Sequence, residues 1–335
     1  MSTTTPVDFG ADDLVLSTEL ANSLADRWRL DDDRLGEICR YALLPPGKLL
    51  RPMLLVESAV AVGGTRYGVL PAAVGAESGH TASLVHDDII DQDELRRGRP
   101  AVHVRYGVDD AIVTGDALLF DLFAGLAGCR YRGVAEARIV DALAEVARCG
   151  VELCRGQMLE AELTRDRCFD AARYRRMVHL KTAALFRGAC VSGALLAGGS
   201  AEEVAALRRY ADELGIAYQI QDDLLGYLSV PAVTGKPQAS DARNGRITMP
   251  LILAGQAGGP AARRAIERQL CGGGDAAARH ARLRRIVAGS GALDEARDLV
   301  REAVGRAGSA LAVLPPGASR TRLRRVAELL LDRDR

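Results

Sequence analysis

Apolar residues recur at intervals of three and four along most of this chain, the spacing that places them on one face of a helix. The pattern predicts further helices from residue 247 onward and, before them, helices over residues 16–30, 35–44, 53–62, 69–91, 109–127, 134–163, 174–196 and 202–228. No run of strand-type alternation, tandem repeat or low-complexity tail interrupts them. We therefore expect an all-α fold in a single domain over residues 1–335, with an N-terminal segment over 1–34 and the core over 35–335.

Proline and glycine mark the breaks between these helices. Two adjacent prolines, Pro45 and Pro46, end the second helix. A charged link over 92–107 and a segment over 231–244 lack the helical period. We expect both to be loops, the first of them ordered and placed at the mouth of the helix that precedes it.

The acidic end of the fourth predicted helix is the most informative stretch. Asp87, Asp88 and Asp91 lie among apolar residues, so they belong to a partly buried segment rather than to a solvated tail. Asp87 and Asp91 share one helix face, where like charges four residues apart are destabilising unless a cation lies against them. Mg²⁺ prefers carboxylate oxygens, whereas Arg96 and Arg97 just beyond suit phosphate oxygens. The rival interpretation is that these arginines simply neutralise the carboxylates.

A second acidic stretch lies far along the chain. Asp222 and Asp223 again occupy an apolar helical segment, with Gln219 one turn before them. Two aspartate pairs that face each other across a bundle would repel without metal between them. We therefore expect a cavity with Mg²⁺ on both sides, which is suited to a polyphosphate.

Composition excludes several classes of function. The chain has 335 residues, 48% of them hydrophobic, and its 44 basic side chains balance its 44 acidic ones. Without a basic field, and with only 4% aromatic residues, it is not suited to bind nucleic acid. It has no visible signal peptide and no long uninterrupted apolar run, so we expect no membrane span. Seven widely spaced cysteines without a Cys-x-x-Cys pair indicate reduced core thiols in a cytoplasmic protein.

Lysine is rare in this chain. Of the 44 basic residues only Lys48, Lys181 and Lys236 are lysines, which leaves 41 arginines. Retention by chance is one interpretation, and a need for a compact ammonium at these positions is the other. Lys48 and Arg51 stand at a helix start, where backbone N–H groups favour an anion, although a solvated helix cap would use the same residues. Lys181 either enters a phosphate site or reaches solvent.

In their order and spacing these motifs resemble those of the all-trans polyprenyl diphosphate synthases, most clearly over residues 40–255. The matching motifs are Gly47-Lys48-Leu49-Leu50-Arg51-Pro52, His80 to Arg97, Lys181-Thr182, Gln219 to Asp223 and Gly235-Lys236. The resemblance implies the isoprenoid synthase fold, a single large helical bundle around a central cavity. It also implies a homodimer that condenses isopentenyl diphosphate with an allylic prenyl diphosphate, with Mg²⁺ as cofactor, to give an all-trans polyprenyl diphosphate.

The resemblance implies a role for each motif. Asp87, Asp91 and Asp222 would coordinate Mg²⁺, and with Asp88, Asp223 and Lys181 they would form the catalytic set. The allylic diphosphate would contact Arg96, Lys181 and Lys236. Isopentenyl diphosphate would be held by Lys48, Arg51, His80 and Arg97, while Thr182 and Gln219 would flank the allylic carbon. Diphosphate leaves when its growing charge is neutralised and can itself accept the final proton, so no dedicated protein base is needed.

Some positions depart from the family pattern. Gly226 stands where many members have a third aspartate in the second motif, which assigns the metal there mainly to Asp222. Glu160 replaces an aspartate that often follows Gly156-Gln157, and the loop over 238–241 lacks the usual glycine.

Small residues before the first motif bear on product length. In the family, bulky aromatics four or five residues before the first aspartate close the floor of the hydrocarbon tunnel, and here Ser83 and Ala82 occupy those positions. We expect a geranylgeranyl or longer product, unless Phe120 or Phe123 on the next helix blocks the tunnel.

Two other functions share parts of this pattern. A class I terpene cyclase has the same fold and one aspartate-rich motif, but its second metal motif would need an acidic residue where this chain has Ile252, after Asn244 and Thr248. A non-catalytic subunit of a heteromeric prenyl synthase would have no need for the retained aspartates and lysines.

Overall fold

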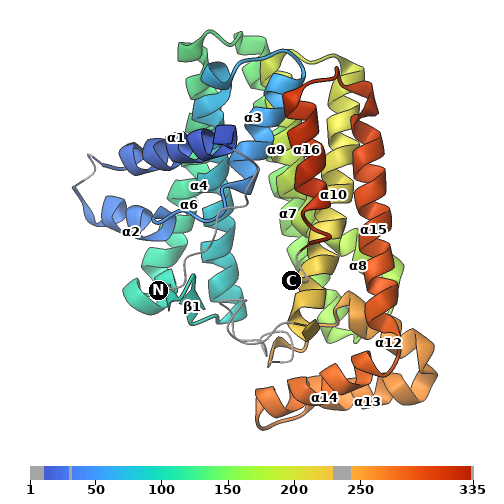
Figure 1. Ribbon diagram of the computed structural model, residues 1–335. Coiled ribbons are helices and arrows are strands. Elements are labelled where there is room, and N and C mark those ends of the chain that lie inside the picture. Colours follow the sequence, from blue (N-terminus) through green and yellow to red (C-terminus); the bar gives the residue numbers. More distant parts are fainter. Residues whose placement is uncertain (1–10, 30–31, 229–242, 333–335) are drawn as a thin grey trace. The chain divides into compact units, whose positions relative to one another are not determined.

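A computed structural model describes residues 11–29, 32–228 and 243–332 of the chain (Figure 1). The chain forms two compact units. The first comprises Met1–Cys149, Leu185–Arg209 and Ala310–Val326, and the second comprises Gly150–Ala184, Tyr210–Ser309 and Ala327–Arg335.

Helices account for most of the described residues. In chain order the elements are α1 (Ala11–Arg27), α2 (Arg34–Leu43), α3 (Leu50–Ala61), α4 (Arg66–Asp91), β1 (Leu95–Arg96), β2 (Arg99–Pro100), α5 (Val102–Tyr106), α6 (Val108–Gly128), the 3-10 helix η1 (Cys129–Arg132), α7 (Glu136–Arg165), α8 (Ala171–Val178), the π-helix η2 (His179–Ala183), α9 (Ala184–Ala197), α10 (Ala201–Leu228), α12 (Met249–Ala257), α13 (Gly259–Cys271), α14 (Ala276–Ala288), α15 (Ala292–Ala310), the 3-10 helix η3 (Leu311–Val313) and α16 (Ala318–Glu328). The predicted all-α class is confirmed.

Close packing of α4 against α6 forms the centre of the first unit (Figure 1). A Cβ atom on Gly125 would lie 2.6 Å from the carbonyl oxygen of Pro71, and one on Gly75 would lie 2.9 Å from that of Leu122. Only glycine allows backbones this close. The acidic C-terminal end of α4 therefore belongs to a tightly held helix.

The N-terminal helix α1 is fixed to the same pair. Leu16, Leu20 and Leu24 recur every fourth residue and are fully buried. Near its end Arg27 Nε donates to Asp121 of α6 over 2.5 Å, and Asp121 also accepts from the Ser78 hydroxyl of α4 over 2.7 Å. Apolar burial and one shared carboxylate thus join three helices of this unit.

A short hairpin follows α4, where we expected a loop without strands. Leu95 of β1 lies opposite Pro100 of β2 in an antiparallel pair. Arg97 and Gly98 between the strands both have positive φ, 53° and 73°, as a tight two-residue hairpin turn requires. The prediction was wrong here because strands of two residues are too short to show alternation in the sequence.

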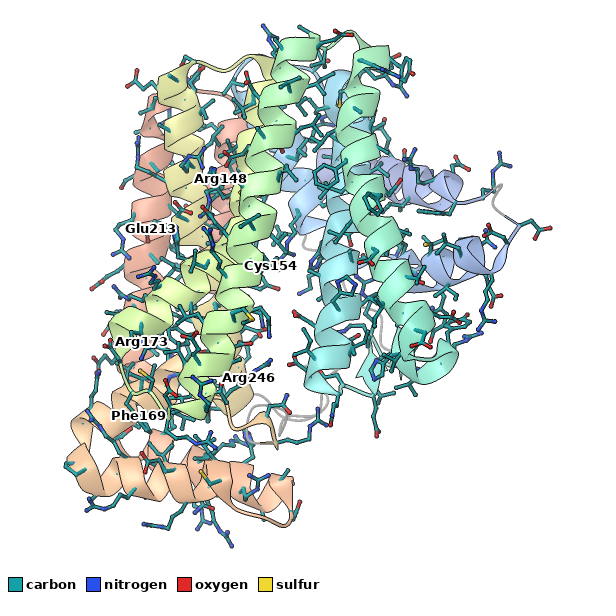
Figure 2. The ribbon with its side chains drawn as sticks, turned by 180° about the vertical axis from the view of Figure 1, so that it is seen from behind. Arg148, Cys154, Phe169, Arg173, Glu213 and Arg246 are labelled. Atoms are coloured by element: carbon teal, nitrogen blue, oxygen red, sulfur yellow. The ribbon has the colours of Figure 1, made fainter. Side chains whose placement is uncertain are left out.

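Helices α8 and α12 to α15, with the later parts of α7 and α10, supply much of the second unit. Asp170 caps α8 by accepting from the backbone N–H groups of Ala172 and Arg173. Next to this cap lies Phe169, which Figure 2 labels. A Cβ atom on Gly255 of α12 would lie 2.7 Å from its ring. The single helix that was predicted over 174–196 is interrupted by η2, whose backbone packs closely against Gly156 of α7 and Gly215 of α10.

Two helical stretches, Val108–Arg132 and Ala171–Ala197, are long and apolar enough to cross a membrane by length and composition alone. The core helix of a soluble protein meets the same criterion, and α6, within the first of these stretches, packs against α4. The expectation of no membrane span therefore stays a prediction.

Glycine positions in this fold give a matched test of packing. Gly193→Ala is expected to lower the free energy of unfolding by about 2 kcal/mol, because its Cβ would lie 2.2 Å from the carbonyl oxygen of Leu55. Gly308→Ala, on α15 with no atom within 4 Å of the added Cβ, is expected to raise it by about 0.5–1 kcal/mol. Denaturant unfolding of both variants checks this. Equal losses of stability would contradict the assigned packing.

Candidate active site

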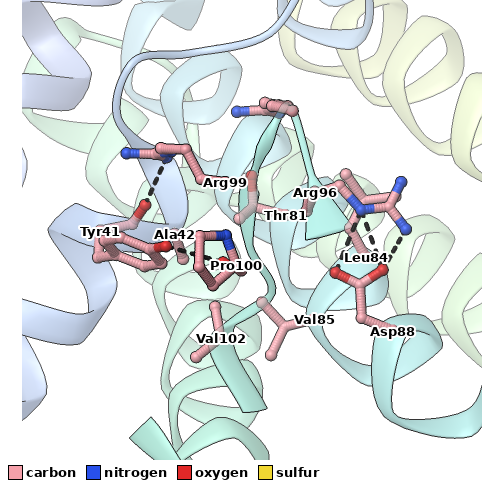
Figure 3. A pocket seen from close by; sticks show the side chains of 11 residues that line it. Tyr41, Ala42, Thr81, Leu84, Val85, Asp88, Arg96, Arg99, Pro100 and Val102 are labelled. Atoms are coloured by element: carbon pink, nitrogen blue, oxygen red, sulfur yellow. Dashed lines mark hydrogen bonds and ion pairs between the residues drawn. The ribbon is translucent and has the colours of Figure 1, made fainter. Parts of the chain in front are cut away.

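At the acidic end of α4, one aspartate is buried and paired while its neighbours stay accessible. Asp88 is 2% exposed, and Arg96 Nε donates to its two oxygens over 3.0 and 3.1 Å (Figure 3). Burial lowers the pKa of Arg96, but the hydrogen bonds and charge of Asp88 raise it above its ordinary value. Asp87 and Asp91 on either side are half-buried. Arg96 thus neutralises Asp88, as the rival interpretation of this motif expected.

A small cavity lies under the hairpin beside this ion pair (Figure 3). Its lining joins Tyr41 of α2 to Asp88 of α4 and to Arg96 of the hairpin. On its far side Tyr41 donates to the carbonyl oxygen of Pro100 over 2.7 Å, and Arg99 donates to the carbonyl oxygen of Tyr41 over 3.0 Å. These contacts tie the hairpin to α2 and keep Arg96 in place.

Three side chains predicted to hold a diphosphate, Arg51, His80 and Arg97, lie together in the first unit, beside the carboxyl group of Glu77. Arg51 of α3 donates to Nε2 of His80 over 3.1 Å. Desolvation, with the positive charge of Arg51 second, lowers the pKa of His80 well below its usual range, so the ring is neutral. Arg97 lies 3.7 Å from Glu77, which stands one turn before His80. Burial raises the pKa of Glu77 to about 7, although Arg97 and Arg51 act in the opposite direction.

The backbone around Arg97 holds its guanidinium in one position. Arg97 Nη1 donates to the carbonyl oxygen of Pro45 over 3.1 Å. A Cβ on Gly47 would lie 2.9 Å from Arg97 Nη2, so the glycine leaves room for this group. Lys48 follows at the start of α3 and is exposed. Arg97 thus packs against the start of the predicted Gly-Lys-x-x-Arg segment, which also carries the exposed Lys48 and the His80-bound Arg51.

In the second unit, the π-turn η2 presents Lys181 and Thr182. A Cβ on Gly156 of α7 would lie 2.4 Å from the backbone nitrogen of Lys181, and one on Gly215 of α10 would lie 2.5 Å from Cα of Ala183. The turn is thus wedged between two helices where neither has room for a side chain. One extra residue in the turn reorients the side chains after it, and such π-bulges often occur at functional sites.

A chain of hydrogen bonds leads from this turn to the second acidic motif. The Thr182 hydroxyl donates to Gln219 Oε1 over 2.8 Å, and Gln219 Nε2 donates to Asp223 over 3.0 Å. Asp223, 6% exposed, also accepts from the Tyr174 hydroxyl over 2.5 Å and from the backbone N–H of Met249 over 2.9 Å. Asp223 therefore joins α8, α10 and α12.

Asp222, the neighbour of Asp223 in the second acidic motif, is exposed. Both acidic motifs thus pair a buried, hydrogen-bonded aspartate with a more accessible one. Among residues 11–29, 32–228 and 243–332, no group of three or more His, Cys, Asp and Glu side chains converges as a ready metal cage. Mg²⁺ commonly takes one or two carboxylates together with substrate phosphates and water. Asp87, Asp91 and Asp222 offer donors of that chemistry.

Lys181 is paired with a carboxylate that the sequence marked as unusual. Its ammonium donates to Glu160 of α7 over 2.6 Å. Arg246, labelled in Figure 2, donates to the same carboxylate oxygen over 3.3 Å. Sequence reasoning did not select Arg246 or Tyr174, since neither lies in a recognised motif. The only signal for Arg246 was its place between the predicted loop and the following helix.

The predicted Gly235-Lys236 motif, the segment over 238–241 and residues 231–242 of the predicted loop over 231–244 lie outside the described residues. Within the first unit the structure brings together Arg51, His80 and Arg97, and separately Asp88 and Arg96. Within the second unit it brings together Thr182, Gln219 and Asp223, with Lys181 on the same π-turn as Thr182.

Known proteins resemble this chain over most of its length. The polyprenyl synthetase family matches residues 32–287. A geranylgeranyl diphosphate synthase of Methanosarcina mazei is 33% identical over 90% of each chain, and a geranylfarnesyl diphosphate synthase of Aeropyrum pernix is 35% identical over 92% of this chain and 96% of its own. Among solved structures, a Caulobacter crescentus polyprenyl synthase complexed with calcium and isoprenyl diphosphate is 31% identical, with a TM-score of 0.87 over 98% of this chain and all of that one. The chain belongs to the polyprenyl synthetase family.

Proposed function

We propose that this protein is a Mg²⁺-dependent prenyltransferase that condenses isopentenyl diphosphate with an allylic diphosphate to give an all-trans polyprenyl diphosphate of geranylgeranyl length or longer. The observation that carries the proposal is the pair of acidic motifs, each with an accessible aspartate beside a buried, fixed one. Relatives named for geranylgeranyl and geranylfarnesyl diphosphate synthesis support it.

Asp87, Asp91 and Asp222 are the proposed Mg²⁺ ligands. When bound, the metal neutralises charge on the departing diphosphate. Asp88 and Asp223 act through the groups they hold, Arg96 in the first case and the start of α12 in the second. Because Asp88 and Asp223 make the structural hydrogen bonds, the neighbouring aspartates are held in position and keep their oxygens for the metal.

The allylic diphosphate is proposed to contact Arg96, Lys181 and Lys236. In the described residues Arg96 and Lys181 are each paired with a carboxylate, Asp88 and Glu160 respectively. A diphosphate offers several oxygens to each cation and so can extend or replace these pairs. Both cations then stabilise the charge that develops as the carbon–oxygen bond breaks.

Isopentenyl diphosphate is proposed to bind at Lys48, Arg51, His80 and Arg97. Its double bond attacks the allylic cation, forming the new carbon–carbon bond, and the released diphosphate accepts the proton that is then lost. Thr182 and Gln219 lie on the hydrogen-bonded chain to Asp223 and flank the reacting allylic carbon in this proposal.

The alternatives are not favoured. In a class I cyclase Ile252 would need to be a metal ligand, but it is an aliphatic residue 1% exposed in α12. Thr248, at the preceding ligand position, is 5% exposed and hydrogen-bonds Tyr227 over 2.9 Å. A non-catalytic subunit would not need accessible Asp87, Asp91 and Asp222.

We also propose that the protein is a homodimer in the cytoplasm. Helix α6 exposes Ile112, Val113 and Phe120, the last of them 74% exposed. An apolar face of this kind on one helix is suited to a second copy of the same helix. Light scattering of the purified chain measures its mass in solution.

Incubation with Mg²⁺, isopentenyl diphosphate and dimethylallyl, geranyl or farnesyl diphosphate is expected to release diphosphate and elongate the chain. Asp87→Asn and Asp91→Asn are each expected to lower kcat on the order of 100-fold or more, because a metal ligand is lost. Asp116→Asn, an exposed carboxylate on α6, is the control. Absence of turnover with all three primers would favour the subunit, and a cyclic hydrocarbon formed without isopentenyl diphosphate would favour the cyclase.

The two aspartates of the second motif are expected to respond differently. Asp222→Asn is expected to lower kcat on the order of 100-fold and to change stability by less than about 0.5 kcal/mol, because Asp222 is exposed. Asp223→Asn is expected to lower the free energy of unfolding by about 2 kcal/mol, because the amide cannot accept all three of its hydrogen bonds. Kinetics and denaturant unfolding of both variants check this, and a large stability loss in Asp222→Asn would contradict it.

Product length is expected to depend on Ser83 and not on Phe120, whose exposed ring points away from the interior of its protomer. Ser83→Phe is expected to shorten the main product by about one isoprene unit, because a small residue is replaced by a ring. Phe120→Ala and Ser83→Ala are the controls, with an unchanged product. Chromatography of the dephosphorylated products measures this. Longer chains from Phe120→Ala would assign the floor of the tunnel to Phe120.

A further inference from the structure

A buried carboxyl group lies among the cations of the first unit, and the proposed chemistry does not use it. Glu77 is 2% exposed, in the middle of α4. A glutamate is almost never this buried unless it is paired, and an ionised one there costs free energy unless cations compensate it. The site therefore contains an acidic group whose charge opposes the binding of an anion.

The charged groups that face Glu77 come from two other elements. Arg97 in the hairpin turn lies 3.7 Å away, and the positive charge of Arg51 of α3 also acts on the carboxyl group. Arg51 is itself fixed by His80 and by the ring of Phe186 in α9, 4.7 Å from the guanidinium. His80, one turn along α4, is neutral and contributes no charge.

These are the same two guanidinium groups to which the proposed function assigns the diphosphate of isopentenyl diphosphate. A diphosphate on Arg51 and Arg97 places like charge beside Glu77 and engages the cations that keep Glu77 ionised. We propose that Glu77 takes up a proton from solvent when this second diphosphate binds, so that its carboxylate becomes a neutral carboxylic acid. This inference rests on the proposed function only for the position of that diphosphate.

Proton uptake by Glu77 fixes the direction in which affinity for isopentenyl diphosphate changes with pH. Because burial raises the pKa of Glu77 to about 7, the free protein begins to lose this proton near neutral pH. Diphosphate raises that pKa further, so the bound form keeps the proton to higher pH. Affinity for isopentenyl diphosphate is then expected to be full below about pH 7 and to fall as pH rises above it.

Calorimetric titration of the full chain with isopentenyl diphosphate alone tests the inference. Repeating it in buffers of different ionisation enthalpy gives the number of protons taken up. At pH 7.5 the wild type is expected to take up about half a proton or more per ligand beyond the uptake of Glu77→Gln. From pH 6.5 to 8.5 its Kd is expected to rise on the order of tenfold more than the Kd of Glu77→Gln.

A matched control is available in Glu57, which is equally buried and also paired with arginines, Arg322 and Arg66. Glu57→Gln is expected to keep the proton uptake of the wild type. Infrared difference spectra of the wild type supply a measurement that does not depend on any variant folding. A protonated carboxyl band is expected to grow when isopentenyl diphosphate is added at pH 7.5.

The results of these experiments distinguish failure of this inference from failure of the proposed function. Equal proton uptake in the wild type and Glu77→Gln would overturn the inference. Uniformly weaker binding by Glu77→Gln with an unchanged pH dependence would also overturn it, since Glu77 would then have only a structural role. No gain of a carboxyl band on binding would also overturn it. No binding of isopentenyl diphosphate at any pH would overturn both this inference and the proposed function, whereas pH-independent binding with normal turnover would overturn this inference alone.

Discussion

The cost of placing carboxylates inside apolar helices is the constraint on which this structure depends. Such a group is tolerated where hydrogen bonds or cations compensate its lost hydration. Asp88 has Arg96, and Asp223 has Tyr174, Gln219 and the backbone N–H of Met249. In each motif the compensated residue fixes the helix locally. The accessible aspartates beside it are then positioned by that helix and do not have to hold it together.

The same constraint explains why the proposed diphosphate-binding cations are paired in the described structure. Arg96 lies against Asp88 and Lys181 against Glu160, so neither adds an uncompensated charge to its surroundings. Isolated buried cations would be costly before substrate arrives. Pairing keeps them charged and close to the acidic motifs, and their remaining donors stay available for phosphate oxygens.

Sequence reasoning reached the helices and the motifs because both have local signals. The three-and-four spacing of apolar residues predicted most of the helices, and the aspartates stood out as charges in apolar segments. The sequence could not predict the hairpin of β1 and β2, the π-turn η2, or the parts played by Tyr174 and Arg246. The strands of the hairpin are too short to show alternation. The other features depend on contacts between residues far apart in the chain, such as the 26 residues that separate Asp223 from Met249. The assignments of Mg²⁺ ligands and substrate contacts stay predictions.

The π-turn shows how packing can set the position of a functional side chain without contacting it. Gly156 and Gly215 leave no space on either side of residues 180–183, so the backbone there meets two helices directly. A regular α-helix through this segment would rotate all later side chains by one residue, about 100°. The extra residue of the π-turn changes that rotation, and in this turn Lys181 reaches Glu160. The two glycines thus allow the close packing that holds the backbone of the π-turn carrying Lys181 and Thr182.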